Sequence, residues 1–205
     1  MNVYTVTQTL QNKSQIRYEL QRRRRQLGSH QRKQAARQIV RHALSGGLLQ
    51  RYVHVGIYLP HGSEIDTLPL FNRILSLGKY TYLPMLPVGR GKRLWFNRIE
   101  AGNHWTENRF GIPENWSQKS VRAQQLDLLF MPLVGYDDLG YRIGMGGGYY
   151  DASLAYLRRR KIWRRPYLVG VAFACQRVDQ IRHDVWDIPL DAILTEHDFH
   201  QFSRK

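Results

Sequence analysis

The apolar run LDLLFMPLV at residues 126–134 is the feature that most constrains how this chain can fold. A run that is almost wholly apolar is typical of a strand covered on both faces, as at the centre of a parallel sheet. Strand-like and helical segments alternate along the rest of the sequence. We therefore expect an α/β fold: a single-domain, three-layer sandwich over residues 1–205, with a mostly parallel sheet and N-terminal helices. The length fits one domain at roughly 100–200 residues per domain.

The individual elements follow from hydrophobic spacing and from the residues that end them. Apolar residues at helical spacing predict two leading helices, one over residues 13–26 and one that Ser29 caps and Gly46 and Gly47 end. Alternating or continuous apolar residues predict strands. The remaining predicted helices cover residues 68–75 and about 150–161, and the strands cover 53–59, 79–84, 93–99, 167–173 and, last, 191–194.

The charge is large and uneven. Lys and Arg number 31 against 16 Asp and Glu, which gives a formal net charge of +15. Residues 1–51 hold 11 of the basic residues and one acid, Glu19. Such asymmetry suggests nucleic acid or an anionic small molecule as a partner. The run Arg22–Arg25 is equally consistent with the solvated face of a helix, so charge alone leaves both readings open.

Cysteine content and hydropathy bear on the compartment. The single cysteine, Cys175, excludes an intrachain disulfide and favours a reducing environment. No run approaches the ~18 apolar residues of a membrane helix. We expect a cytoplasmic protein with no membrane partner. His197 and His200, near the end of the chain, favour a solvated tail over a metal site.

The strongest local motif is RIGMGGGYYD at residues 142–151, between an apolar strand and an amphipathic helix. Glycines there allow backbone N–H groups to approach an anion closely. Arg142 could pair with phosphate oxygens, and Asp151 could hold a divalent cation that those phosphates share. The motif lacks the Gly-Lys-Ser/Thr of a Walker A loop, and Tyr149 breaks the G-x-G-x-x-G pattern. The alternative is a flexible turn that only reverses the chain.

The segment PLVGYDDLGYRIGMGGGYYDASL (132–154) resembles the signature of the 5-formyltetrahydrofolate cyclo-ligase family, also called 5,10-methenyltetrahydrofolate synthetases. Further segments resemble that family in the expected order from residue 13 to residue 196. They are KSQIR (13–17), SEIDT (63–67), FGIPE (110–114) and DAILTE (191–196). Three departures stand out: Asn115 replaces the proline expected after Glu114, Gly147 stands where some members carry a lysine, and Trp186 precedes Asp187 where a histidine is common.

The resemblance implies an enzyme that joins ATP to 5-formyltetrahydrofolate and releases methenyltetrahydrofolate, ADP and phosphate, with Mg²⁺ required. It implies that Asp151 and Asp191 serve the metal ion and that Glu64, Arg142 and Tyr149 act in catalysis. The residues implied to hold ATP are Lys13, Arg17, Arg142, Gly144, Met145, Gly146, Gly147, Gly148, Tyr149 and Tyr150. Those implied to face the folate are Leu59, Glu64, Phe110 and Tyr149.

The chemistry of that reaction agrees with these residue types. An N5-formyl group is an amide, so phosphorylation of its oxygen makes a leaving group before N10 attacks. Such a path needs positioning and charge neutralisation more than a protein nucleophile. The expected partner is 5-formyltetrahydrofolate, with or without a polyglutamate tail, acted on by a monomer that does not require nucleic acid. The alternatives are a basic nucleic-acid-binding protein and an ATP-dependent enzyme for another formyl compound.

Overall fold

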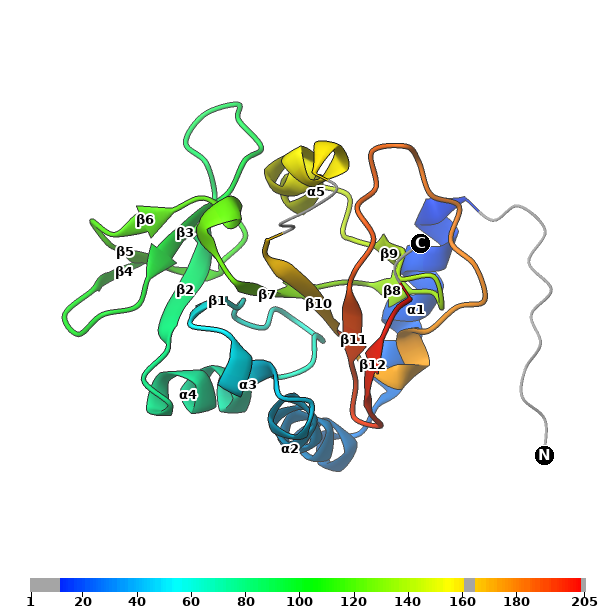
Figure 1. Cartoon of the computed structure of the whole chain (residues 1–205). Coiled ribbons are helices and arrows are strands. Elements are labelled where there is room, and N and C mark those ends of the chain that lie inside the picture. Colours follow the sequence, from blue (N-terminus) through cyan, green and yellow to red (C-terminus); the bar gives the residue numbers. More distant parts are fainter. Residues whose placement is uncertain (1–11, 161–164, 204–205) are drawn as a thin grey trace.

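The computed structural model describes residues 12–160 and 165–203. Over these residues the chain builds one eight-stranded sheet (Figure 1). Its strands are β1 (His54–Gly56), β2 (Tyr80–Met85), β3 (Trp95–Arg98), β6 (Ser120–Val121), β7 (Leu128–Pro132), β10 (Tyr167–Val171), β11 (Ala192–Leu194) and β12 (Phe199–Gln201). Their order is β12-β11-β10-β7-β1-β2-β3-β6. The pairs from β11 to β2 are parallel, whereas β12, β3 and β6 join antiparallel at the edges.

Strand β7 occupies the centre, as the apolar run predicts. Leu128 and Phe130 pack into the core on one face of the sheet, and Leu129 and Met131 pack into the core on the other. Successive side chains of a strand point to opposite faces, so a strand covered on both sides must be apolar throughout. The prediction of a mostly parallel sheet with a buried central strand is confirmed.

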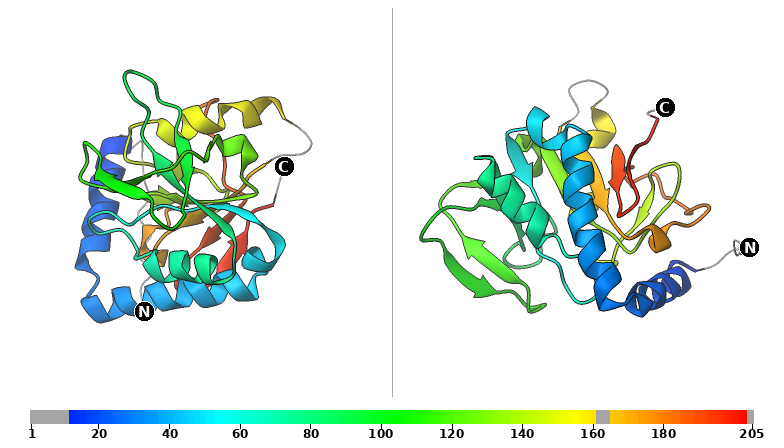
Figure 2. Two further views of the ribbon diagram at one scale, coloured as in Figure 1. Left: turned by 90° about the vertical axis from the view of Figure 1, so that its left-hand side faces the viewer. Right: turned by 90° about the horizontal axis from the view of Figure 1, so that it is seen from below.

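Helices complete the three layers. On one face lie α2 (Ser29–Ser45), α3 (Leu48–Arg51) and α4 (Leu68–Ser76), and on the other lies α5 (Tyr149–Leu154), followed by the 3₁₀ turn η2 (Ala155–Arg159). Figure 1 shows α2 and α4 opposite α5, and Figure 2 shows α2 and α4 from below, in front of the strands. Helix α1 (Lys13–Gln26) packs Ile16 and Leu20 against Val134 and Ile143, beside the carboxyl end of β7.

Several predicted boundaries are corrected. The strand expected over residues 53–59 is limited to β1; Val53, expected to face the core, is 47% exposed, and both Ile57 and Tyr58 are buried. The helix expected over 150–161 is α-helical only to Leu154, and residue 161 lies outside the described residues. Leu154 and Leu157 both enter the core, a spacing of three that matches the 3₁₀ turn.

Helix α2 begins at Ser29 itself, with Gly28 as its N-cap, so the expected cap is one residue off. The expected solvated tail is corrected in part: His197 and His200 are exposed, but β12 pairs with β11 and Phe199 packs against the core. Two hairpins were not predicted: β4 (His104–Glu107) with β5 (Pro113–Trp116), and β8 (Gly135–Tyr136) with β9 (Arg142–Ile143). Two further 3₁₀ turns are η1 (Ala123–Gln125) and η3 (Ala174–Gln176). No helix among the described residues is long and apolar enough to span a bilayer.

Candidate active site

The glycine loop, residues 144–148, connects β9 to α5 and is mostly exposed. Gly146 and Gly148 have φ values of 98° and 70°, a region that side-chain-bearing residues rarely adopt. A Cβ on Gly144 would meet no atom within 4 Å, so the space above the loop is open. Glycine is therefore required by the backbone at residues 146 and 148, and the loop presents accessible main chain to a ligand.

Helix α1 carries two of the predicted ATP cations, Lys13 and Arg17. The Arg17 Nε donates to the carbonyl of Gly144 at 2.8 Å. One turn earlier, the Lys13 Nζ lies 2.8 Å from Asp184 and 3.5 Å from Asp187, in the segment before β11. The hydrogen bond to Asp184 is the main cause that raises the pKa of Lys13. The structure thus brings Arg17 to the glycine loop, although 127 residues separate it from Gly144, whereas Lys13 contacts Asp184 and Asp187.

Arg142 and Asp151 form an ion pair across the loop. The Arg142 Nη2 lies 2.5 Å from the Asp151 Oδ1, with the Arg142 side chain 6% exposed and the Asp151 side chain 37% exposed. Arg142 also donates to the carbonyl of Ile188. The two residues predicted to serve phosphate and metal are therefore each other's partners, one buried and one reaching solvent.

Asp191 is more deeply placed than Asp151. It is 8% exposed, and its Oδ2 accepts the N–H of Leu168 at 2.8 Å, which fixes the start of β11 against β10. Among the described residues, no group of three or more His, Cys, Asp or Glu could hold a metal ion. A magnesium ion would need phosphate oxygens in addition to the carboxylates, which is how Mg²⁺ commonly binds in nucleotide sites.

A second group surrounds Glu64, in the loop after β1. The Glu64 Oε2 accepts the His61 N–H at 3.0 Å. Burial raises the pKa of the Glu64 carboxyl, while the His61 N–H and the positive charge of Arg24 oppose that rise. Burial also raises the pKa values of the Tyr58 and Tyr150 phenols, with the charge of Glu64 adding to both. Glu64 therefore lies near Tyr150, the residue that follows Tyr149 at the end of the glycine loop.

The remaining predicted folate residues are Leu59 and Phe110. Leu59 is half-buried against the core beside Tyr58. Phe110 is 50% exposed at the turn of the β4–β5 hairpin. The Arg109 guanidinium lies 5.2 Å from the Phe110 ring centre and 5.8 Å from the Tyr149 ring centre, and it donates to the Tyr149 hydroxyl. Arg109 thus connects the hairpin turn to the glycine loop.

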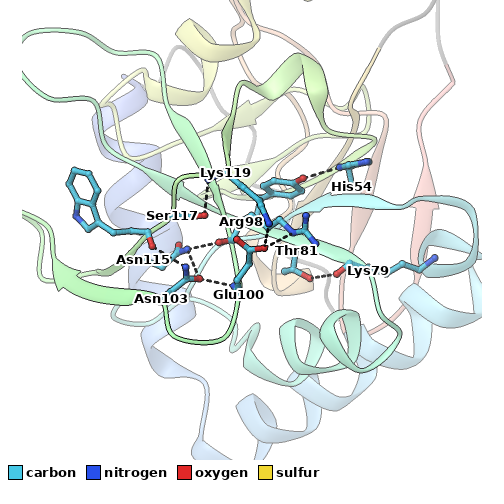
Figure 3. A network of polar contacts seen from close by, with 11 residues as sticks. His54, Lys79, Thr81, Arg98, Glu100, Asn103, Asn115, Ser117 and Lys119 are labelled. Atoms are coloured by element: carbon cyan, nitrogen blue, oxygen red, sulfur yellow. Dashed lines mark hydrogen bonds and ion pairs between the residues drawn. The ribbon is translucent and has the colours of Figure 1, made fainter.

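Polar contacts hold this hairpin on the edge of the sheet. The Asn115 Nδ2 donates to the Arg98 carbonyl at 3.0 Å, and the Asn115 carbonyl accepts from Asn97 at 2.6 Å. Figure 3 shows Asn115 with Asn103, whose side chain bonds to Glu100 and to the Trp116 carbonyl. Asn115, one of the three departures from the family pattern, therefore anchors the base of the hairpin whose turn presents Phe110.

The structure brings most of the predicted residues into two adjoining groups, which meet at Tyr149 and Tyr150. Sequence reasoning missed further residues there: Arg24, Arg109, Lys92, Asp184 and Asp187. The Lys92 Nζ lies 3.9 Å from the position of a Cβ on Gly148. Local sequence does not predict these contacts, because each residue reaches the site from a loop or helix distant in the chain.

The Arg22–Arg25 run does not form one solvated face. Arg22 and Arg23 pair with Glu19, at 2.9 Å and 3.1 Å, and Arg25 is exposed. Arg24 is 5% exposed and donates to the Ser63 hydroxyl. The interpretation as a wholly solvated face is therefore wrong for Arg24. Since one of the four is buried and two are paired, the run is also a poor continuous surface for nucleic acid.

Comparison with known proteins gives a consistent result. The model of the 5-formyltetrahydrofolate cyclo-ligase family matches residues 9–196. A 5-formyltetrahydrofolate cyclo-ligase of Haemophilus influenzae is 34% identical over 188 residues, which cover 90% of this chain and 97% of that protein. The protein of the same name from Escherichia coli K12 is 33% identical over 179 residues, covering 86% and 96%.

Solved structures agree. The Aquifex aeolicus 5,10-methenyltetrahydrofolate synthetase superposes with a TM-score of 0.78 at 28% identity and covers 94% of each chain. The synthetase of Mycoplasma pneumoniae superposes with a TM-score of 0.71 at 22% identity, covering 91% of this chain and 99% of that one. The latter likeness concerns the fold alone.

Proposed function

The chain belongs to the 5-formyltetrahydrofolate cyclo-ligase family, and we propose that it converts 5-formyltetrahydrofolate to 5,10-methenyltetrahydrofolate with ATP and Mg²⁺. The observation that carries the proposal is that Arg109 connects the Phe110 turn to Tyr149 at the end of the glycine loop, while Glu64 lies close enough to Tyr150 for its charge to act on the phenol. An anion-binding loop and a partly buried carboxylate on adjoining surfaces are what a phosphoryl transfer to a folate requires.

The nucleotide side of the proposal rests on charge and access. Lys13, Arg17 and Arg142 would neutralise phosphate oxygens, with the main chain of residues 144–148 and the tyrosines 149 and 150 beside them. Arg17 contacts the Gly144 carbonyl. Lys92, near Gly148, supplies a cation that the glycine at residue 147 does not. Met145, 65% exposed and in contact with Gln21 of α1, lies at the rim.

Asp151 fits a magnesium site better than Asp191 does. Asp151 lies beside the glycine loop with over a third of its side chain exposed, whereas Asp191 is buried and one of its oxygens accepts a backbone N–H. We propose that Asp151 holds the ion together with phosphate oxygens, and that Asp191 contributes indirectly by fixing the start of β11. When bound, magnesium would neutralise charge that develops on the transferring phosphoryl group.

The folate side would consist of Glu64, Leu59, Phe110 and Tyr149. Glu64 has a fixed oxygen that accepts from His61, and we propose that its carboxylate orients the pterin or N10 through hydrogen bonds. Phe110 offers an exposed ring for the flat pterin, as aromatic rings stack at offset geometry. Arg109 would set the distance between that ring and Tyr149.

The residues then have separable tasks. The cations and the glycine loop hold the transferring phosphoryl group near the formyl oxygen, which becomes a leaving group as phosphate. Glu64 and Phe110 hold the pterin so that N10 faces the activated carbon. N10 attacks the activated carbon and loses its proton to solvent, phosphate departs with the former formyl oxygen, and the methenyl bridge closes. Orientation of this kind is worth several orders of magnitude in rate, and Glu64 need not abstract a proton as a full general base.

The test is direct. We would mix the purified protein with 5-formyltetrahydrofolate, MgCl₂ and ATP, and follow the near-UV absorbance of the methenyl product together with ADP release. Growth of the band with matching ADP, absent without ATP, supports the proposal. A folded protein that gives no band with verified substrate contradicts it, and other formyl compounds would then be assayed. The proposed monomeric state and cytoplasmic location would be tested by sedimentation and by cell fractionation.

A further inference from the structure

Arg24 differs from its neighbours in the arginine run at residues 22–25. It is 5% exposed, while the adjacent Arg25 is exposed on the same helix. Moving an arginine charge out of water is costly unless hydrogen bonds and an opposite charge compensate it. The surroundings of Arg24 must therefore supply that compensation, and they identify what the residue does.

The compensation comes from the loop that carries Glu64. The Arg24 Nε donates to the Ser63 Oγ at 2.9 Å. Arg32 of α2 donates to the Ser63 carbonyl at 2.9 Å and also to the Arg24 carbonyl. Two arginines from two helices thus hold Ser63 by its side chain and by its main chain. Because Ser63 precedes Glu64 directly, these contacts fix the backbone from which the Glu64 carboxylate projects.

Arg24 also lies close enough to Glu64 for the two charges to interact. The positive charge of Arg24 favours ionised Glu64, and the negative charge of Glu64 favours protonated Arg24. The other charged or titratable groups around Glu64 are His61, Tyr58 and Tyr150. Around Arg24, Arg25 and Arg32 add repulsion, so Glu64 is the carboxylate that offsets this local excess of positive charge.

We propose that Arg24 is a positioning residue for the folate site: it fixes the Ser63–Glu64 backbone and keeps a positive charge beside the Glu64 carboxylate. Its catalytic consequence rests on the proposed function, because that function places Glu64 against the substrate. The structural part of the proposal does not rest on that function, because the contact of Arg24 with Ser63 and its proximity to Glu64 are features of the protein alone.

The experiment compares Arg24→Gln with Arg25→Gln, the same change one residue away on the exposed side. The first readout is the pKa of Glu64 in the ligand-free protein, from ¹³C NMR of labelled glutamate carboxyls assigned with Glu64→Gln. We expect Arg24→Gln to raise this pKa and Arg25→Gln to leave it at the wild-type value. The second readout is steady-state kinetics. We expect Arg24→Gln to raise the KM for 5-formyltetrahydrofolate about tenfold, leave the KM for ATP within twofold, and move the acidic limb of the pH profile upward.

Two further variants protect the test against misfolding. Arg24→Lys keeps the positive charge, so the Glu64 pKa should stay near the wild-type value. Ser63→Ala removes the hydroxyl acceptor but leaves the Arg24 charge, so the KM for 5-formyltetrahydrofolate should rise. An unchanged Glu64 pKa in Arg24→Gln, or an equal shift in Arg25→Gln, overturns the proposal. If Arg24→Gln does not fold, the decisive variant is Arg24→Lys. An upward shift of the Glu64 pKa in Arg24→Lys would then overturn the proposal. If the wild type makes no methenyl product, the proposed function fails, and the NMR comparison still decides whether Arg24 controls Glu64.

Discussion

Replacing Asp151 by alanine should destabilise the protein as well as affect magnesium. The Asp151 carboxylate lies 2.5 Å from the Arg142 guanidinium, which is 6% exposed. Without Asp151, that guanidinium keeps the Ile188 carbonyl as an acceptor but loses its neighbouring negative charge. The perturbation therefore leaves a buried cation partly uncompensated, an expensive arrangement in a protein interior.

The size of the effect follows from the burial of the two partners. Removing one partner of a fully buried ion pair costs about 3–5 kcal/mol, and removing one of an exposed pair about 0–1 kcal/mol. Asp151 is 37% exposed, so water can enter the space it leaves and hydrate Arg142 in part. We therefore expect a loss of about 1–2 kcal/mol. For a chain of this length, that lowers the melting temperature by about 2–8 °C.

Urea denaturation followed by tryptophan fluorescence measures the loss, and the chain offers a matched control. Asp138 also lies 2.5 Å from an arginine, Arg177, but these side chains are 57% and 60% exposed. Asp138→Ala should therefore cost less than about 0.5 kcal/mol. Equal costs for the two variants would refute the reasoning from burial. Asp151→Asn, whose amide oxygen can still accept from Arg142, should be intermediate in stability yet lose the magnesium dependence of ATP binding.

Three more outcomes are expected. Burial raises the pKa of Glu64 by more than the charge of Arg24 and the His61 N–H lower it, so ionisation of Glu64 near pH 7 costs stability even with Arg24 beside it. Glu64→Gln should therefore be more stable than wild type at pH 7 in urea titrations and lose this advantage as the pH falls to about 4. In Gly170→Ala the new methyl would lie 2.6 Å from Leu133, so calorimetry should show that the free energy of unfolding falls by about 1–3 kcal/mol. In the control Gly144→Ala the methyl meets no atom within 4 Å, so the free energy of unfolding should stay within about 0.5 kcal/mol of wild type. Phe110→Ala should raise the KM for 5-formyltetrahydrofolate about threefold to tenfold without changing the KM for ATP, since ring contacts are worth about 0.5–1.5 kcal/mol.

The layered fold could be predicted because its main elements have strong periodic signals. The run at 126–134 and the apolar stripes of α2 and α4 each specify one buried surface. The β4–β5 hairpin could not be predicted in the same way. Strand β4 is exposed at every residue, and β5 is held by the polar contacts of Asn115 rather than by an apolar face. Its sequence therefore lacks the alternation that reveals a strand.

In the candidate site too, some residues could be predicted from the sequence and others could not. The glycine loop is continuous in sequence, so its residues could be predicted together. The groups that control it come from elsewhere: Arg109 from the hairpin turn, and Asp184 with Asp187 from the segment before β11. Arg24 shows both sides of this division. Its spacing of four from Leu20 and eight from Ile16 places it on the buried face of α1, but nothing local predicts that it contacts the Ser63 loop.

Two of the three proposed phosphate cations have carboxylate partners in the structure. Lys13 pairs with Asp184 and Asp187, and Arg142 pairs with Asp151. ATP would therefore have to exchange with carboxylates, and each exchange leaves a carboxylate without its cation. For Arg142 the imbalance has a ready solution: Asp151, once released, is free to bind a divalent cation that the same phosphates share. Nucleotide and magnesium would then each raise the affinity for the other by the same factor, as linkage requires. The Arg142–Asp151 ion pair is thus a physical reason for nucleotide and magnesium to bind together.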